Sequence, residues 1–450
     1  MTTRNRQRGA VLLVGLIILM TAMAAALVSM FSQKMGNARR EQQTANALAQ
    51  AKQALLGDAF SRSLASSICG TDCPRPGDLP CPDLHPLGDP NEGRPGNAAN
   101  QCPNNTNVLG RLPWRTLGLP DLRDGWGERL WYARSERFRN QFHVAMGPLN
   151  PDTAYGQISV RASDGGSMLN TAAAASGSGA VAVIIAPGAP LTRNDGLQQS
   201  RGTANYLTAA HYLDCWGTSG CNIEDNANFI NGSPTNGFIM GPIRNNGRDV
   251  VNDRLITISR DEMLSVMSNR VAGETAQALE TYFTGNSFYK GAAPLSNQNC
   301  LGTGNVFGSC DGVSGLTFGR MPALPSPVAA PFNGMVNNNW FQQNGWREFV
   351  FYAIAPDCSS ESVNCVAGGG LITVNNQSGT AIAGKRVVVI VSGGALGGQV
   401  RVSAADKTIL ANYLEDINVN QIPASNLFTR RPATPNVSFN DVLATVPRLP

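Results

Sequence analysis

The chain has 450 residues, of which 42% are hydrophobic and only 15% charged, and its formal net charge is +4. This length predicts two or three domains with a sizeable core. The weak basic charge excludes an electrostatic nucleic-acid binder, which would carry clustered Lys and Arg. Three histidines argue against a His-rich metal site, and the even number of ten cysteines has to be interpreted from the cellular compartment.

The N-terminal sequence predicts a membrane segment. Residues 10–33 carry no charge, and Arg4, Arg6 and Arg8 precede them without an acidic residue. About 20 apolar residues span a bilayer, and a basic flank stays on the cytoplasmic side. The pattern therefore predicts a transmembrane helix over 10–33 and a periplasmic position for the rest of the chain. The alternative is a secretory signal cleaved near residues 24–26, which read Ala-Ala-Ala.

The helix is expected to continue beyond this segment. Residues 34–62 contain no proline, and Gly36 and Gly57 are their only glycines. Ala, Gln and Leu, all good helix formers, dominate the run from Glu41 to Phe60. We therefore expect one unbroken helix of about 50 residues, roughly 75 Å long, with its second half under a separate head.

The N-terminal region has a basic leader that ends in Arg8-Gly9, an apolar helix that starts at Ala10, and an amphipathic continuation. In these features the chain resembles type IV prepilins and type II secretion pseudopilins. The resemblance implies that a prepilin peptidase cleaves after Gly9 and methylates Ala10. It also implies a single-pass inner-membrane protein with a periplasmic head, which enters an extracellular filament after assembly. Val14 stands at the fifth mature position, where the family usually has Glu. This departure favours a minor or tip subunit, since an unpaired carboxylate in lipid is costly and is kept only where it is needed.

The same resemblance implies the partners, which are other pilins or pseudopilins bound through the N-terminal helix. Small residues let helix backbones approach closely. The expected packing positions are Val14, Gly15, Ala22 and Ala25.

A ten-residue segment of the sequence occurs twice. Residues 124–133 (DGWGERLWYA) align without gaps with residues 344–353 (NGWREFVFYA), 220 positions later. Four further pairs of segments follow in the same order in both halves, so the sequence predicts an internal duplication rather than chance similarity of two β-rich regions. The paired segments are 157–160 and 371–374, 180–186 and 386–392, 211–214 and 412–415, and 252–258 and 440–446.

Each half is expected to begin with a helix, the second one at Ser259-Arg260-Asp261-Glu262, which fits a capping box. The predicted fold class is α+β, in which a long N-terminal membrane-spanning helix leads into two tandem pilin-like units of one helix and an antiparallel sheet. The predicted segments are a leader (1–9), the transmembrane helix (10–33), its periplasmic extension (34–62), a first unit (63–258) and a duplicated second unit (259–450).

The cysteines all follow residue 68, and in a periplasmic head they are expected to form disulfides. Spacing favours three near-neighbour pairs, while the first four cysteines allow three connectivities. A redox or zinc site is the weaker interpretation, because no Cys-x-x-Cys occurs. The favoured pairs are Cys215 with Cys221, Cys300 with Cys310 and Cys358 with Cys365, and the undecided four are Cys69, Cys73, Cys81 and Cys102.

A cofactor is not expected, although one loop offers several oxygen ligands to calcium: Asp83, Asp89, Asn91 and Glu92. Their spacing matches no defined motif, so a solvated acidic loop is the favoured interpretation. No nucleophile motif accompanies the histidines. The sequence thus predicts a non-enzymatic minor pilin or pseudopilin of a pilus or secretion filament; the alternative is a membrane-anchored periplasmic adhesin or ligand-binding protein outside any filament.

Overall fold

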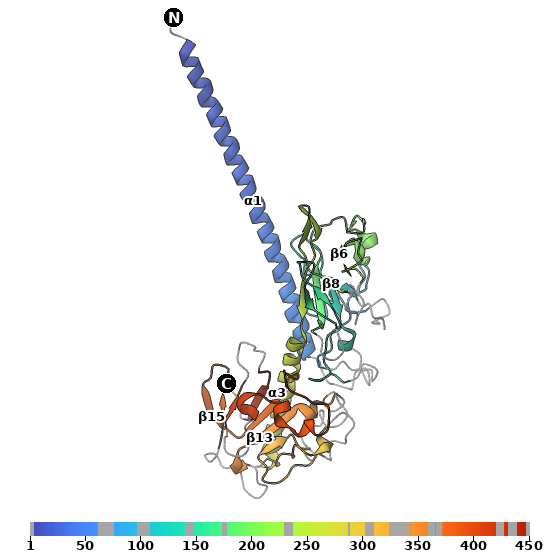
Figure 1. Cartoon of the computed structure of the whole chain (residues 1–450), viewed down its shortest axis with the longest axis vertical. Coiled ribbons are helices and arrows are strands. Elements are labelled where there is room, and N and C mark those ends of the chain that lie inside the picture. The colour runs from blue at the N-terminus through green and yellow to red at the C-terminus, as the bar shows by residue number, and fades with distance from the viewer. Residues whose placement is uncertain are drawn as a thin grey trace.

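The computed structural model combines helices with a larger number of strands. It describes residues 4–61, 76–96, 109–139, 148–172, 178–228, 237–286, 289–301, 310–323, 341, 344–358, 365, 371–419, 427–430 and 439–446. Helix α1 (Arg4–Ser61) projects from a head that contains two groups of sheets, one beside the helix and one beyond its C-terminal end (Figure 1). We call the described residues of 76–258 the first unit and those of 260–446 the second unit.

The prediction of a membrane-spanning helix is wrong for this structure. Within the described ranges, none of the helices combines the length and the apolar character that crossing a bilayer requires. Helix α1 is long enough, but most of its described side chains lie in 34–61, and this part carries six charged residues. This finding overturns the predicted transmembrane segment over 10–33, the fold class that contained it and the single-pass inner-membrane localisation.

The second half of α1 packs on the first unit. One face of the helix is buried at three-to-four-residue spacing, which is typical of a helix on a sheet. Strands β5 and β11 receive this face. The buried positions of α1 are Thr44, Ala47, Leu48, Ala51, Leu55 and Ala59.

The first unit has a central antiparallel sheet in the order β1-β2-β5-β11. Alternate residues of a strand point to opposite faces. Tyr132 and Ile184 accordingly join the core under α1, whereas Trp131 and Ile185 join a second core on the other face. The strands are β1 (Leu109–Arg111), β2 (Trp131–Arg134), β5 (Ala182–Ala186) and β11 (Arg254–Ile258).

Smaller sheets complete the first unit. A three-stranded sheet has the order β4-β3-β8, and its Val160 and Phe238 lie in the second core. Two hairpins, β6-β7 and β9-β10, lie outside it. The bounds are β3 (Val160–Arg161), β4 (Met168–Asn170), β6 (Cys215–Trp216), β7 (Glu224–Asp225), β8 (Phe238–Ile239), β9 (Ile243–Asn245) and β10 (Arg248–Val251).

The second unit repeats this arrangement. Its central sheet has the order β12-β13-β16-β18, with antiparallel pairing throughout. Its smaller sheet has the order β15-β14-β17, again with one antiparallel and one parallel pair. The bounds are β12 (Phe318–Arg320), β13 (Val350–Ile354), β14 (Ile372–Asn375), β15 (Ala381–Lys385), β16 (Val387–Val391), β17 (Leu427–Thr429) and β18 (Val442–Val446).

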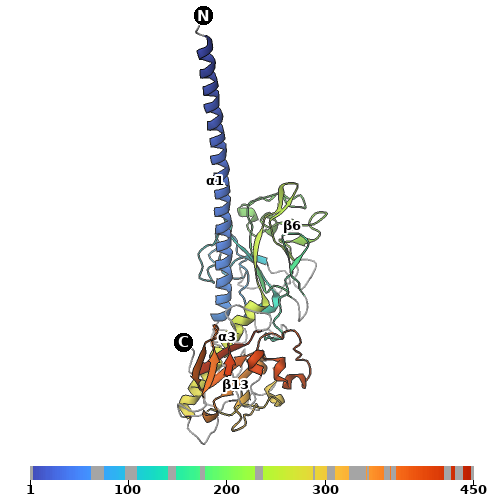
Figure 2. The ribbon, with the colours of Figure 1, turned by 60° about the vertical axis from the view of Figure 1, so that its left-hand side comes forward.

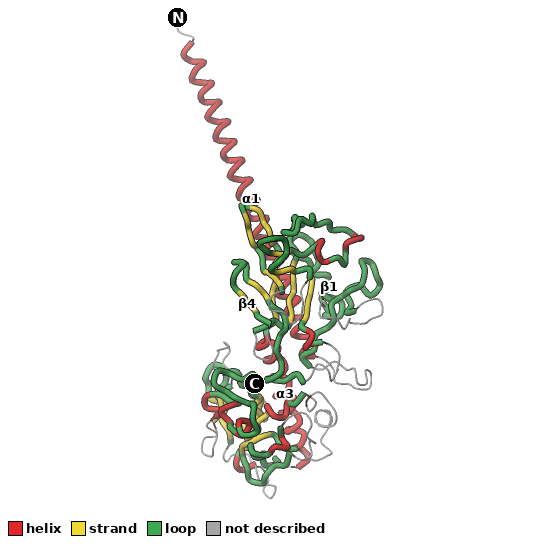
Figure 3. Tube along the Cα trace, turned by 45° about the vertical axis from the view of Figure 1, so that its right-hand side comes forward, coloured by secondary structure: helices red, strands yellow, loops and turns green. Residues whose placement is uncertain are grey.

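Helix α3 (Arg260–Asn286) opens the second unit and packs on β16 and β18, as α1 packs on β5 and β11. The capping box is confirmed: the Glu262 carboxylate accepts the Ser259 N–H at 2.9 Å, and the Ser259 hydroxyl accepts the Glu262 N–H at 3.2 Å. Loops form much of the head between these elements (Figure 3). Segments that match in sequence therefore occupy matching places in two sheets of the same order, while the division at residue 259 stays a prediction.

Polar contacts join the units. The Asn344 side chain accepts the Leu149 N–H at 2.7 Å, and the Asn344 carbonyl accepts the Asn150 amide at 2.7 Å. Nearby, Arg401 pairs with Asp152 at 3.0 Å. The Arg401 side chain is only 2% exposed, so this ion pair is better shielded from solvent than a typical surface pair.

Candidate assembly surface and buried polar centres

The predicted assembly residues all lie on α1. Gly9 and Ala10 lie within the helix, as do Val14, Gly15, Ala22 and Ala25, but the side chains at these positions lie outside those that the structure describes. The described apolar side chains of this part are open to solvent: Leu19, Met20 and Met23 are 56%, 64% and 60% exposed. Figure 1 shows that this part of the helix extends away from both units.

A tight contact fixes α1 to the first unit. The Gly125 N–H donates to the Thr44 hydroxyl at 3.0 Å, and a Cβ on Gly125 would lie 2.3 Å from the Arg40 carbonyl oxygen. Only glycine permits this approach of the 124–128 turn to the helix. Arg254 of β11 adds an ion pair with Glu41 at 2.7 Å. The turn belongs to the repeated segment 124–133, so this segment helps to fix the direction in which the exposed part of α1 extends.

The predicted calcium loop uses its oxygens internally. The Asp83 carboxylate accepts N–H bonds from His85 and Gly93 at 2.9 and 2.7 Å. The Glu92 carboxylate accepts the Gly88 N–H at 2.8 Å and pairs with Arg129. The remaining two ligands form a local turn, in which Asp89 accepts the Asn91 N–H at 2.7 Å. The carboxylates of Asp83, Asp89 and Glu92 thus have separate backbone or arginine partners, and burial raises the Asp83 pKa.

The three favoured cysteine pairs are disulfide-bonded in the structure. Cys81 is disulfide-bonded as well. Cys69, Cys73 and Cys102 lie outside the described residues. Asp195 lies beside the Cys215–Cys221 bond, but disulfide sulfurs are not the thiolates that bind zinc.

Two of the three histidines are described, and both serve local structure. The His85 imidazole is fully buried, with Nδ1 at 2.8 Å from the Asp83 carboxylate. His211 Nδ1 accepts the Ser200 N–H at 3.2 Å. His143 lies outside the described residues. No serine or cysteine nucleophile is hydrogen-bonded to the described imidazole nitrogens in these contacts.

Each unit also holds a buried arginine that the sequence analysis missed. The Arg111 guanidinium lies 4.1 Å from the Trp131 and Tyr212 ring centroids, and burial lowers its pKa to about 10. In the second unit, Arg320 lies 5.1 and 4.9 Å from the Phe351 and Tyr413 rings, and burial lowers its pKa too.

A second repeat marks these arginines. Residues 109–113 read LGRLP and residues 318–322 read FGRMP. Each arginine bridges the edge strand to loop carbonyls: Arg111 donates to the Arg129 and Tyr206 carbonyls, and Arg320 to those of Glu348 and Lys407. An arginine buried against aromatic rings with its N–H groups on backbone carbonyls ties loops to the sheet, so these centres are structural.

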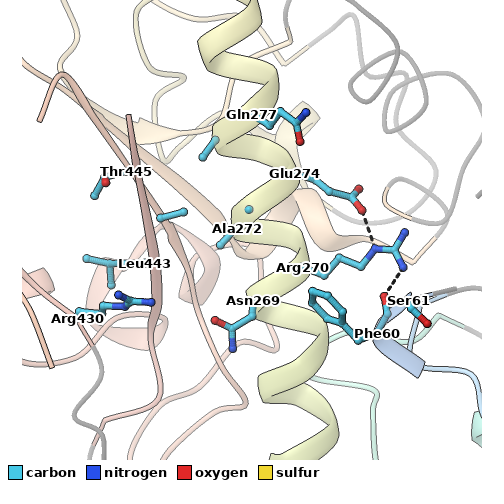
Figure 4. A pocket seen from close by; sticks show the side chains of 13 residues that line it. Phe60, Ser61, Asn269, Arg270, Ala272, Glu274, Gln277, Arg430, Leu443 and Thr445 are labelled. Carbon is cyan, nitrogen blue, oxygen red and sulfur yellow. Dashed lines mark hydrogen bonds and ion pairs between the residues drawn. The ribbon is translucent and has the colours of Figure 1, made fainter. Parts of the chain in front are cut away.

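A pocket of about 540 Å³ lies where the end of α1, helix α3 and strand β18 meet (Figure 4). Its wall combines apolar residues of α3 and β18, such as Ala272 and Leu443, with polar ones, such as Asn269 and Thr445. Arg270 lines it too, but its guanidinium is occupied by Glu274 and by the Phe60 carbonyl, both at 2.6 Å. The volume falls within the range of small-molecule sites, which often form between domains.

Comparison with known proteins adds no relative: no family model matches the chain, and no curated protein or solved structure is significantly similar to it.

Proposed function

We propose that this chain is a non-enzymatic, low-abundance or tip component of a pilin-like filament of the type IV pilus or type II secretion class. One observation carries the proposal: a single helix is anchored in the head by its second half and exposes apolar side chains on its first half. Leu19, Met20 and Met23 would lose unfavourable contact with water by packing against helices of neighbouring subunits.

The double head supports a low-abundance role. Two units sit on one α1, with the second unit beyond its C-terminal end (Figure 2). In a filament built only of such subunits, every subunit would have to place two units on the filament surface, where neighbouring heads would clash. A tip or rare subunit avoids this clash. Val14, in place of the usual Glu, supports the same role.

The mature N-terminus tests the proposal. Mass spectrometry of the chain from its native cells should find N-methylated Ala10 as the first residue, and Gly9→Leu should leave the leader in place. An intact Met1 in the unmodified chain, or a start after Ala26, contradicts the prepilin interpretation.

Photocrosslinking tests the surface directly. A benzoylphenylalanine in place of Met20 or Met23 should crosslink to other filament subunits in cells. The same probe at Leu207, which is 40% exposed on the first unit, is the matched control and should not crosslink to the same subunits. Equal crosslinking from all three positions contradicts assembly through α1.

The pocket of Figure 4 favours a second candidate, a head that binds a small ligand outside any filament. Substituting Gln277, an exposed residue of α3 that lines this pocket, with Trp would narrow it. If the head binds a ligand outside any filament, this change abolishes that binding and the probes at Met20 and Met23 reach no filament subunit. If the chain is a filament component, both probes crosslink to filament subunits and the change leaves this crosslinking unaltered.

A further inference from the structure

The first unit contains two buried carboxyl groups, those of Asp214 and Asp253, and each accepts a hydrogen bond from the other residue's backbone N–H. One Asp214 oxygen accepts the N–H groups of Asn252 and Asp253 at 2.6 and 3.2 Å, and the other accepts the Gln199 amide at 2.9 Å. In return, one Asp253 oxygen accepts the Asp214 N–H and the Asn226 amide, both at 2.8 Å. Both side chains are fully buried. The pair connects the start of β11 to the loop between β5 and β6.

The second unit builds the same pair from Glu415 and Asp441. The Glu415 carboxylate accepts the N–H groups of Asn440 and Asp441 at 2.9 and 3.2 Å and the Gln399 amide at 3.0 Å. One Asp441 oxygen accepts the Glu415 N–H at 3.1 Å and the Asn418 amide at 3.0 Å. Five hydrogen bonds recur one for one, although one partner has changed from Asp to Glu.

The two members of each pair differ in the same way. Asp214 and Glu415 accept three N–H donors spread over both oxygens. Asp253 and Asp441 accept donors on one oxygen only, and within the described residues the buried Oδ1 of each has no hydrogen-bond partner. Leaving a buried anionic oxygen without a donor costs far more free energy than burying the neutral, protonated carboxyl, so burial favours the protonated form.

The charge of Arg201 lowers the pKa values of Asp214 and Asp253, but by less than burial raises them. In the first unit, Arg201 donates to the Tyr212 carbonyl at 3.2 Å and lies 3.6 Å from Glu128. Arg193 donates to the Leu213 carbonyl at 2.6 Å and pairs with Asp225 at 3.0 Å. In the second unit, the charge of Glu415 adds to burial in raising the Asp441 pKa.

We propose that Asp253 and Asp441 each hold a proton at neutral pH. Each unit therefore contains a proton-dependent clamp, the carboxyl pair with its five hydrogen bonds, which stabilises the fold more in acid than in alkali. This proposal is independent of the filament role. Burial raises the Asp214 pKa to about 7, and burial together with the partner's charge raises the pKa values of Asp253 and Asp441 well above normal.

The sign of the pH effect follows from proton linkage. A carboxyl whose pKa is raised by folding keeps its proton in the folded chain while the unfolded chain releases it. The clamp is therefore strongest near and below pH 4, and it weakens as the pH rises toward the folded pKa values. For each retained proton, the unfolding equilibrium constant rises about tenfold per pH unit in this window.

Infrared spectroscopy of the folded protein tests the proposal. At pH 7 the unmodified chain should show the C=O band of protonated carboxyl groups. Asp253→Asn and Asp441→Asn should each remove part of this band, and the double variant should remove more of it than either single variant. Asp249→Asn, an exposed position of the β9-β10 hairpin, is the matched control and should leave the band unchanged.

Unfolding measurements provide a second readout. Urea midpoints of the unmodified chain should fall between pH 5 and pH 8, and the fall should be smaller in Asp253→Asn and smaller still in the double variant. If a variant does not fold, the infrared band of the unmodified chain decides alone. Absence of that band in the folded protein at pH 7, or an unchanged band in both single variants, overturns the proposal.

Discussion

Both units contain a four-stranded and a three-stranded sheet in matching order, but matching side chains in them contact different neighbours. In the first unit, the Asp124 carboxylate closes its own turn by accepting the Trp126 and Glu128 N–H groups at 2.8 and 2.9 Å. Its counterpart in the second unit, Asn344, accepts the N–H of Leu149 from the other unit. An aspartate that holds a turn has thus become an asparagine that joins two units, because the side-chain oxygen of either residue accepts an N–H.

A surface loop shows the opposite kind of change. Ser200, Gly202 and Thr208 of the first unit correspond in order to Val400, Val402 and Ile409 of the second. These three apolar side chains are 49%, 87% and 51% exposed. At matching buried positions both units thus keep a side chain that accepts the same kind of hydrogen bond, because its loss would leave buried N–H groups unpaired, whereas the exposed positions differ in chemical character.

The largest expected effect comes from the contact of the first unit with its helix. Gly125→Ala should lower the free energy of unfolding by about 3 kcal/mol, because the new Cβ would overlap the Arg40 backbone. Gly273→Ala in α3, where the Cβ meets no atom within 4 Å, is the control and should stabilise by about 1 kcal/mol. Urea unfolding measures both changes. If Gly125→Ala had the same midpoint as the unmodified chain, the 124–128 turn would have shifted away from α1 without loss of stability.

The next effect concerns the junction. Asn344→Ala removes the acceptor of the buried Leu149 N–H, which should cost about 2 kcal/mol. It should also separate the unfolding of the two units into two transitions in calorimetry. Asn245→Ala, on the exposed β9-β10 hairpin, is the control, and a single unchanged transition in Asn344→Ala contradicts the junction's role.

A smaller, pH-dependent effect is expected between the two helices. Lys52 of α1 pairs with Glu262 of α3 at 2.6 Å, and the Lys52 and Ser259 hydrogen bonds lower the Glu262 pKa against the opposing effect of burial. A lowered pKa contributes stability above the unfolded value, and this contribution is lost as the pH falls through the folded value.

Glu262→Gln should therefore cost a few tenths of a kcal/mol at pH 7, after solvent screening of this partly exposed pair, and nothing at pH 3. Urea midpoints at the two pH values measure the difference. A cost of equal size at both would mean that the capping hydrogen bonds, rather than the charge, matter.

The smallest effect on stability should come from the surface loop. Replacing Val400, Val402 and Ile409 by the corresponding first-unit residues Ser, Gly and Thr should change the free energy of unfolding by less than about 1 kcal/mol in total. It should also reduce self-association in sedimentation experiments, because exposed apolar side chains favour association. A large loss of stability would show that these side chains support the fold.

Much of the head could be predicted from residue order. The apolar runs at 180–186 and 386–392 became β5 and β16, and the Ser259–Glu262 box began α3, because alternation, apolar length and capping chemistry are local properties. The membrane-spanning helix was predicted on the same kind of local pattern and is contradicted by the structure.

The buried centres could not be derived from spacing. Asp214 and Asp253 lie 39 positions apart in sequence, and Arg111 reaches Tyr206 across 95 positions. Only sheet pairing brings such residues together. The Gly-Arg pair shared by 109–113 and 318–322 marks the two arginines in the sequence. Periodicity, however, cannot predict that these arginines are buried or which residues they contact.

The sequence by itself determined the long helix, the repeated strands and the near-neighbour disulfides, since each depends on residues close together along the chain. The tertiary structure decided which half of α1 is covered, which turn holds it, how Asn344 joins the units and where two carboxyl groups lose contact with water. These outcomes depend on burial and on long-range pairing, which fix the free energy of a charge or a hydrogen bond only once the chain has folded.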